Sequence, residues 1–414
     1  MITSVKRWVR NRAVSLLNST LFFGPGPMLG PPHVDGIAPI RNSDEALTLS
    51  PFWAGVRKYQ RALGSLPIVT YETDADGGRK RLDKSPTYWM LHDRPNPAQS
   101  RSVMMEWIAL QLFTEREVFI QVRMTNDGYL VGLYPIHCSR LVNIVMDADW
   151  NKAFVIRTEN GVEVFPEAEI IHLFLFSRDG LRGTRILDYA AESLGLHKQV
   201  QRSAGSFYEQ AVRPSGYLKF PGTLDAPAVK QIRDHFLTEY GGATNRGKMP
   251  VTMNNGEFLP LTNTNADDAR IIEALGASVP DIARWLGLSP LQLGDLSRGT
   301  YSNLGADNAA FYQDSLRPLL EKIELEFNAK IFGVQSPVYC QFDTNAILRG
   351  DPNEQATVAN IGIQNGTVTR NEQRSWLDLP KLPGLDEPMV PLNMGTNTSH
   401  STDLKQIAGT ATTP

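Results

Sequence analysis

The chain has 414 residues, of which 42% are hydrophobic and 9% aromatic, enough for two or three domains with their own cores, so wholesale disorder is excluded. Its 41 Lys and Arg against 44 Asp and Glu give a net charge of -3, which excludes the global basic excess of tight nucleic-acid binders. No apolar run reaches the length of a membrane-spanning helix, so no membrane partner is expected.

The two cysteines, Cys138 and Cys340, have neither the paired spacing of a zinc site nor the pattern of a disulfide framework. We therefore expect two ordinary thiols in a reducing compartment, with no metal and no cofactor.

The N-terminal segment has the basic-then-apolar order of a signal peptide, with three cations before an apolar stretch at residues 13–23. Polar residues interrupt this stretch, and Gly24-Pro25-Gly26-Pro27 follows it without a small-residue cleavage pattern. We predict that residues 1–40 are an N-terminal arm and a Gly/Pro-rich linker.

Residues 41–183 read as an α+β domain. Ser50 followed by Pro51 is typical of an N-cap and a first helical position, and one apolar face then follows. The expected face consists of Phe52, Val56, Tyr59 and Leu63. A later helix is expected to bury Val103, Trp107 and Leu110.

Strands follow in the same domain. Alternating residues 118–124 turn at Asn126-Asp127-Gly128 into 129–134, and Asn160-Gly161 joins 154–157 to 162–165, so two antiparallel hairpins are predicted. Residues 170–176 are apolar on both faces except at His172, which favours a covered strand and a core histidine over a metal ligand.

From Thr184 to Val212 the pattern becomes helical without a proline, which predicts a helix about 40 Å long. Residues 213–262 then form a small inserted α/β unit. Its expected elements are a strand at 216–220, a helix at 226–240 and a hairpin of 251–253 with 257–259.

A phosphate-loop pattern, G-x-x-x-x-G-K, ends at Gly247-Lys248 inside this unit. Met249 occupies the position of the Mg²⁺-binding Ser or Thr, and Pro250 blocks the helix that should follow. A loop with two exposed cations is therefore a better interpretation than a nucleotide-binding enzyme.

The pattern of residues 263–287 predicts a second long helix. Pro280 within it indicates either a kink or a new helix start capped by Ser278. Residues 288–304 are rich in Leu, Gly and Ser and read as a loop. Helix resumes by Asp307, with a kink expected near Pro318. Its predicted apolar face is Phe311, Leu319, Ile323 and Phe327. We expect residues 381–414 to be a flexible tail with few apolar anchors.

The order of several short motifs resembles that of portal proteins of tailed double-stranded-DNA bacteriophages. The motifs lie at 92–97, 213–218, 286–294, 300–303, 316–326 and 365–374, within a resemblance that spans about residues 47–379. Each motif alone is weak. One departure is Leu304-Gly305, where the family pattern usually has a Glu.

The resemblance implies an α+β, portal-like fold. It assigns 41–183 to the wing domain, 184–212 and 263–287 to the long stem helices, 213–262 to an α/β clip subdomain, 288–304 to a tunnel loop and 305–380 to a mainly helical wing and crown side.

The resemblance also implies a ring, a dodecamer, at one capsid vertex of the virion, assembled in the host cytoplasm. Double-stranded DNA would pass through this ring during packaging and ejection, independently of DNA sequence. The implied partners are the terminase large subunit, the major capsid and scaffold proteins and a head–tail adaptor.

The tunnel loop carries the residues expected to face DNA. We predict transient contacts rather than tight phosphate binding, because a channel must let DNA slide and each neutralised phosphate adds attraction. Arg298 is the sole cation of this set and could equally pair with an acid of the adjacent subunit. The predicted DNA-channel residues are Gln292, Leu293, Asp295, Ser297, Arg298 and Thr300.

Two other functional classes stay open from the sequence. An adaptor or minor capsid protein would lack the unit inserted between two stem helices. An enzyme would need a catalytic motif such as His-Glu-x-x-His or Gly-x-Ser-x-Gly, and no such motif occurs in the chain, so no catalytic residue is predicted.

Overall fold

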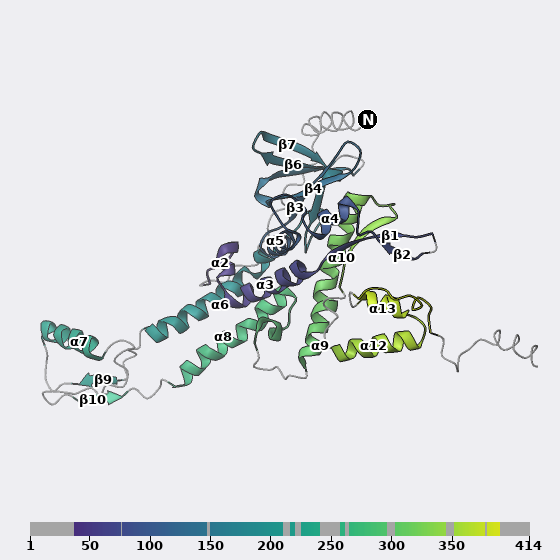
Figure 1. The fold of residues 1–414 in the computed structure, drawn as a ribbon. Coiled ribbons are helices and arrows are strands. Elements are labelled where there is room, and N and C mark those ends of the chain that lie inside the picture. The colour runs from purple at the N-terminus through teal and green to yellow at the C-terminus, as the bar shows by residue number, and fades with distance from the viewer. Residues whose placement is uncertain are drawn as a thin grey trace, which may run out of the picture. The chain divides into compact units, whose positions relative to one another are not determined.

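The computed structural model describes residues 37–75, 77–146, 150–209, 216–219, 225–240, 257–260, 265–295, 303–344, 352–376 and 379–389. The chain divides into two compact units, residues 1–343 and 344–414 (Figure 1). The predicted segment 305–380 therefore crosses a boundary between units.

The first unit begins with helices and a three-stranded antiparallel sheet in the order β11-β1-β2. Its elements are α2 (Ser43–Leu47), α3 (Ser50–Ser65), β1 (Ile68–Thr73), β2 (Arg79–Arg81), α4 (Pro86–His92), α5 (Arg101–Thr114) and, from the far end of the unit, β11 (Val338–Phe342).

Helix α3 buries the face predicted from its periodicity. Phe52, Val56, Tyr59 and Leu63 are all buried, which confirms that prediction. The expected cap is wrong, because Leu49 is the N-cap residue and its side chain makes no capping hydrogen bond. Ser50 is already helical, and Pro51 still lies in the first turn.

Helix α5 buries a different face from the one predicted. Val103 is 53% exposed, whereas Met104, Met105, Ile108 and Leu112 are buried. From Val103 to Phe113 only Glu106 and Gln111 are polar, so the sequence pattern does not identify which face packs inward.

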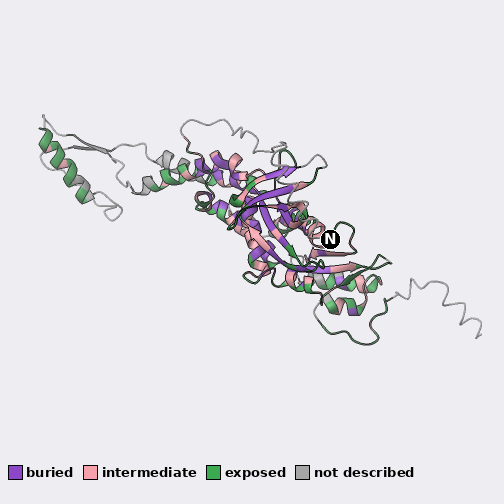
Figure 2. Cartoon of the chain, turned by 90° about the horizontal axis from the view of Figure 1, so that it is seen from above, coloured by how far each residue is buried: buried purple, intermediate pink, exposed green. Residues whose placement is uncertain are grey.

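Two further antiparallel sheets enclose an apolar core, with strand orders β4-β3-β8 and β5-β6-β7. The strands are β3 (Val118–Met124), β4 (Leu130–Ile136), β5 (Leu141–Met146), β6 (Lys152–Thr158), β7 (Gly161–Pro166) and β8 (Ile170–Leu173), with short helical turns η1 (Cys138–Arg140) and η2 (Glu167–Glu169) between them. Both predicted hairpins are confirmed by the β3–β4 and β6–β7 pairs. Phe119, Phe154 and Ile170 join the two sheets in one buried cluster. Figure 2 shows the buried residues gathered in this region.

His172 is a core histidine, as predicted. Its ring stacks on Phe119 with centroids 4.8 Å apart, and its Nε2 lies 3.4 Å from the Oε1 of Glu117. Among the described residues that nitrogen has no hydrogen-bond partner of good geometry.

Glu117 is a buried carboxylate that ties the turn before α6 to strand β3. It accepts from Arg182 Nε at 2.9 Å and from the backbone N–H of Gly183 at 2.6 Å. Burial alone would raise the pKa of Glu117, but His172 and Arg182 hold that pKa below its usual value. The buried charge is thus paired on several sides.

Two long helices, α6 (Ile186–Glu209) and α8 (Asn265–Leu286), lie side by side (Figure 1). Between them in sequence come β9 (Gly216–Lys219), α7 (Ala226–Tyr240) and β10 (Glu257–Pro260). β10 pairs with β9, and the predicted hairpin partner at 251–253 lies outside the described residues. The phosphate-loop pattern also lies outside them, immediately after α7.

Helix α8 runs through Pro280, so the expectation of a new helix start there is wrong. After the turn η4 (Pro290–Leu293), helix continues as α9 (Asn303–Ala310), η5 (Phe311–Leu316), α10 (Arg317–Phe327) and η6 (Asn328–Phe332). The predicted apolar face of this helix is buried throughout. η5 is a π-helical turn directly before Pro318, and such a widened turn accommodates the missing N–H of proline.

The second unit contains α12 (Pro352–Gln364) and α13 (Arg370–Trp376). The 365–374 motif comprises the turn between them and the first five residues of α13, and Thr369 and Glu372 make a reciprocal capping box there. The side-chain amide of Asn371 donates to Leu382 O at 2.8 Å and accepts from Leu382 N at 3.0 Å. Residues 381–389 are therefore fastened to α13, unlike the flexible tail expected there.

Candidate functional site

The candidate site lies where α6, α8 and α3 meet the beginning of the 288–304 loop. The Nδ1 of His197 on α6 is 2.6 Å from the Oγ of Ser278 on α8, and both residues are buried. Burial lowers the pKa of His197, because its charged form would lose hydration. Ser278 thus joins two helices and does not cap one, which corrects its predicted role.

The C-terminal end of α8 is fixed by side chains from other helices. Tyr59 on α3 donates its hydroxyl to Leu286 O at 2.8 Å, and Ser315 donates to Gly287 O at 2.6 Å. Gly287 has φ +66, a conformation suited to glycine. Burial raises the pKa of Tyr59 to about 12, so the hydroxyl remains a donor. Side chains from other helices thus satisfy Leu286 O and Gly287 O, whereas local backbone N–H groups satisfy Ala283 O and Arg284 O.

The loop then begins with a folded turn rather than an open segment. Ser289 Oγ accepts from Gln292 N, and the Gln292 side chain accepts from Ser289 N at 3.3 Å, which makes a capping box around η4. Gly294 ends the turn at φ +89. Residues 289–294 therefore form a compact, locally specified turn.

Asp307 on α9 binds this turn from the other side of the loop. Ser289 donates to Asp307 Oδ1 at 2.6 Å, and Gln292 Nε2 donates to Asp307 O at 2.8 Å. We name Ser289, Gln292 and Asp307 the loop clamp. It joins the two ends of the loop, because Ser289 precedes the loop's middle and Asp307 follows it.

Gly55 lets α3 pack against the leucines of this region. A β-carbon at Gly55 would stand 2.3 Å from Leu286 Cδ1, 3.1 Å from Leu293 Cδ2 and 3.2 Å from Leu288 Cδ1. Only glycine leaves room for all three, so α3, the end of α8 and η4 form one packed contact.

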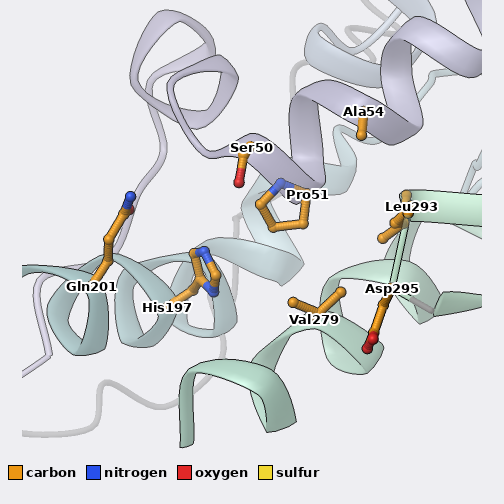
Figure 3. Close-up of a pocket in the computed structure, with 9 residues that line it drawn as sticks. Ser50, Pro51, Ala54, His197, Gln201, Val279, Leu293 and Asp295 are labelled. Atoms are coloured by element: carbon orange, nitrogen blue, oxygen red, sulfur yellow. The ribbon is translucent and has the colours of Figure 1, made fainter. Parts of the chain in front are cut away.

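A cavity of about 390 Å³ borders this contact. Figure 3 shows His197 and Gln201 of α6 on one side, Ser50 and Pro51 of α3 above, and Leu293 and Asp295 of the loop on another side. Its lining is mixed, with the polar Ser50, His197, Gln201 and Asp295 beside the apolar Pro51, Ala54, Val279 and Leu293.

A larger cavity, about 950 Å³, lies on another face of α8. Its floor is formed by Glu273, Gly276, Ala277 and Pro280, and its walls by residues of the turn and of α9. Among the described residues, no group of three His, Cys, Asp or Glu is placed to bind a metal. No helix within the described ranges is long and apolar enough to cross a bilayer.

The predicted DNA-channel residues divide into two groups. Gln292 belongs to the loop clamp, Leu293 packs near Gly55, and Asp295 borders both cavities and has a partner. Ser297, Arg298 and Thr300 lie outside the described residues. The structure thus brings the first group together at the base of the loop.

Several residues that shape the site were not assigned to it from the sequence. Gly55, Tyr59 and His197 are remote from the loop in sequence, and Lys58 lies over the ring of Phe311 at 4.7 Å. Burial lowers the pKa of Lys58, while Asp307 opposes that shift. The Ser289–Gln292 spacing was a readable signal, since Ser-Pro-x-Gln is a capping-box pattern.

The chain is similar in sequence and in fold to several known proteins. The probable portal protein of Streptomyces phage phiC31 is 28% identical over 367 residues, which cover 85% of this chain and 79% of the phage protein. Two solved structures are similar in fold at 19% identity. A chain in the virion of a native gene transfer agent particle has a TM-score of 0.61 and covers 89% of this chain and 99% of its own.

A chain in the neck of a native gene transfer agent particle, computed with C12 symmetry, has a TM-score of 0.56 and covers 84% of this chain and 97% of its own. The sequence profile described as "Phage portal protein" matches residues 50–378. The chain therefore belongs to the phage portal protein family.

Proposed function

We propose that this portal protein forms a closed ring of twelve copies at one vertex of a phage capsid. The ring is the channel through which double-stranded DNA enters during packaging and leaves during ejection. Family membership and similarity to chains of ring-symmetric particle necks support this proposal. In the virion, the protein acts as a structural component.

The observation that carries the proposal is the pair of long helices with a small unit inserted between them and a clamped loop at their base. α6 and α8 would form the stem, β9, α7 and β10 belong to the clip, and residues 288–304 form the tunnel loop. An adaptor or minor capsid role is disfavoured, because neither requires such an insertion between stem helices.

The proposed partners follow from position. The clip end of the stem would dock the terminase large subunit during packaging and the head–tail adaptor afterwards. The wing domain would contact the major capsid and scaffold proteins. DNA contact would be weak and independent of sequence, as the net charge of -3 favours.

The direct test is ring formation by the purified full-length chain. Negative-stain micrographs should contain closed rings with a central hole, and class averages should have twelve-fold symmetry. A species that remains monomeric or dimeric at high concentration contradicts the proposal.

A test of the role of the 288–304 loop requires a deletion that leaves the folded turn at residues 289–294 intact. Removal of residues 297–300 spares the loop clamp, whereas removal of 291–298 would delete Gln292 and with it the clamp. We expect the 297–300 deletion to form rings but to package or retain less DNA. Loss of the ring in this variant would show that the loop is needed for assembly instead.

A further inference from the structure

The stem helices α6 and α8 each carry one exposed charge, of opposite sign, at the same height along the helix pair. The two charges lie on opposite sides of the pair. Arg202 lies five residues after His197 on α6, and Glu273 lies five residues before Ser278 on α8. His197 and Ser278 touch, and Ser193 of α6 accepts from Trp285 Nε1 of α8 at 3.2 Å, so the helices run antiparallel. Arg202 and Glu273 are therefore both about 7.5 Å beyond the His197–Ser278 contact, toward the inserted unit.

The helical rotation points both side chains away from the partner helix of the same chain. Five residues turn a side chain by about 140° from the His197–Ser278 contact, given about 100° per residue. Both residues are exposed, and among the described residues neither makes an ion pair. Each flank thus presents outward a charge that has no ion-pair partner among the described residues.

The side of α8 that carries Glu273 borders a cavity. Glu273, Gly276, Ala277 and Pro280 form the floor of the cavity of about 950 Å³. The charged residues around it are Glu273, Asp295, Asp307 and Arg284, and Arg284 already pairs with Asp281. The surroundings are therefore acidic, and the small side chains of the floor leave room for a long basic side chain.

We propose that the occupant of this cavity is a second copy of the chain, and that Arg202 of one copy pairs with Glu273 of the next copy around the ring. This inference rests on the proposed function, because it requires a ring with the stem along its axis. Rotation about that axis keeps residues at their level, so the α6 flank of one copy meets the α8 flank of the next at matching height. The charges match at that level.

Charge reversal tests this contact. Arg202→Glu and Glu273→Arg each place like charges at every subunit interface, so each should raise the subunit concentration for half-assembly by about tenfold or more. The double variant restores opposite charges and should assemble within about threefold of the wild type. Sedimentation velocity measures assembly, and circular dichroism of the unassembled chain verifies folding. Lys80→Glu on exposed strand β2 is the matched control and should assemble normally.

Cross-linking provides a second measurement that does not depend on weakened assembly. After treatment with a bifunctional thiol reagent as long as an extended Arg–Glu pair, Arg202→Cys/Glu273→Cys should give a ladder of covalent oligomers on a denaturing gel, whereas either single cysteine variant should not. Single reversals that assemble like the wild type, a double variant without rescue, or a missing ladder would each overturn the inference. If the wild type itself forms no ring, the proposed function fails first.

Discussion

The imidazole of His197 and the hydroxyl of Ser278 lie 2.6 Å apart in the contact between α6 and α8, with both side chains buried. This polar contact couples the two long helices next to the base of the loop. Because a buried polar atom without a partner is costly, the pair should be more important than a surface contact of the same length.

Ser278→Ala should destabilise the fold by about 1–3 kcal/mol, since His197 Nδ1 would stay buried without this partner. His197→Leu/Ser278→Ala removes both polar groups and should cost less than the sum of the two single variants. Urea unfolding at pH 7.5 measures the cycle. Strict additivity would mean that the two side chains do not interact in solution.

Stability should also depend on pH through His197. The folded-state pKa lies below 6.5, so below that pH the unfolded chain binds a proton that the folded chain does not. The free energy of unfolding should therefore fall as pH drops below about 6.5. His197→Gln should flatten this dependence relative to the wild type, and His235→Gln on exposed α7 should leave it unchanged. Equal slopes for His197→Gln and the wild type would count against a buried neutral imidazole.

Gly55→Leu should destabilise the fold by about 1–3 kcal/mol, because its side chain would meet Leu286, Leu288 and Leu293. Gly205 on α6 is the matched control, because an added β-carbon there meets nothing within 4 Å. Gly205→Ala should stabilise the unassembled chain by about 0.5–1 kcal/mol through helix propensity. Thermal unfolding separates the two. A neutral Gly55→Leu would mean that the contact of α3 with the turn is loose.

Glu117→Gln should cost about 3 kcal/mol, because the Arg182 guanidinium would remain largely buried without its carboxylate. Glu321→Gln is the control, since Glu321 and Arg317 form an exposed i,i+4 pair and no measurable change is expected. Urea unfolding of both variants is the measurement. Similar costs for the two would contradict a special role for burial.

The buried face of a helix could be predicted from the sequence where apolar positions contrast clearly with charged ones. The predicted α3 face is buried at every position, and the charged residues Arg57, Lys58 and Arg61 separate its last three members. In α5 apolar residues occur on several faces, and the predicted apolar face included Val103, which is half exposed. His172 was predictable as a core residue because its neighbours in the strand are apolar.

Contacts between segments that are distant in sequence could not be predicted from the sequence. Ser278 has the features of a cap before Pro280, and its bond to His197 depends on how α6 packs on α8. Gly55 gives no local signal of the three leucines around it. The base of the loop was expected to be irregular, yet its Ser289–Gln292 capping box specifies a turn that Asp307 then completes.

The loop clamp has a mechanical consequence. Ser289 and Gln292 stand before the middle of the loop and Asp307 after it, and their bonds close the loop at its base. If DNA passes along this loop as proposed, a force on residues 288–304 would be shared between α8 and α9 rather than carried by one helix. The clamp thus fixes the spacing of the two ends of the loop, so that a load on one end is carried by both.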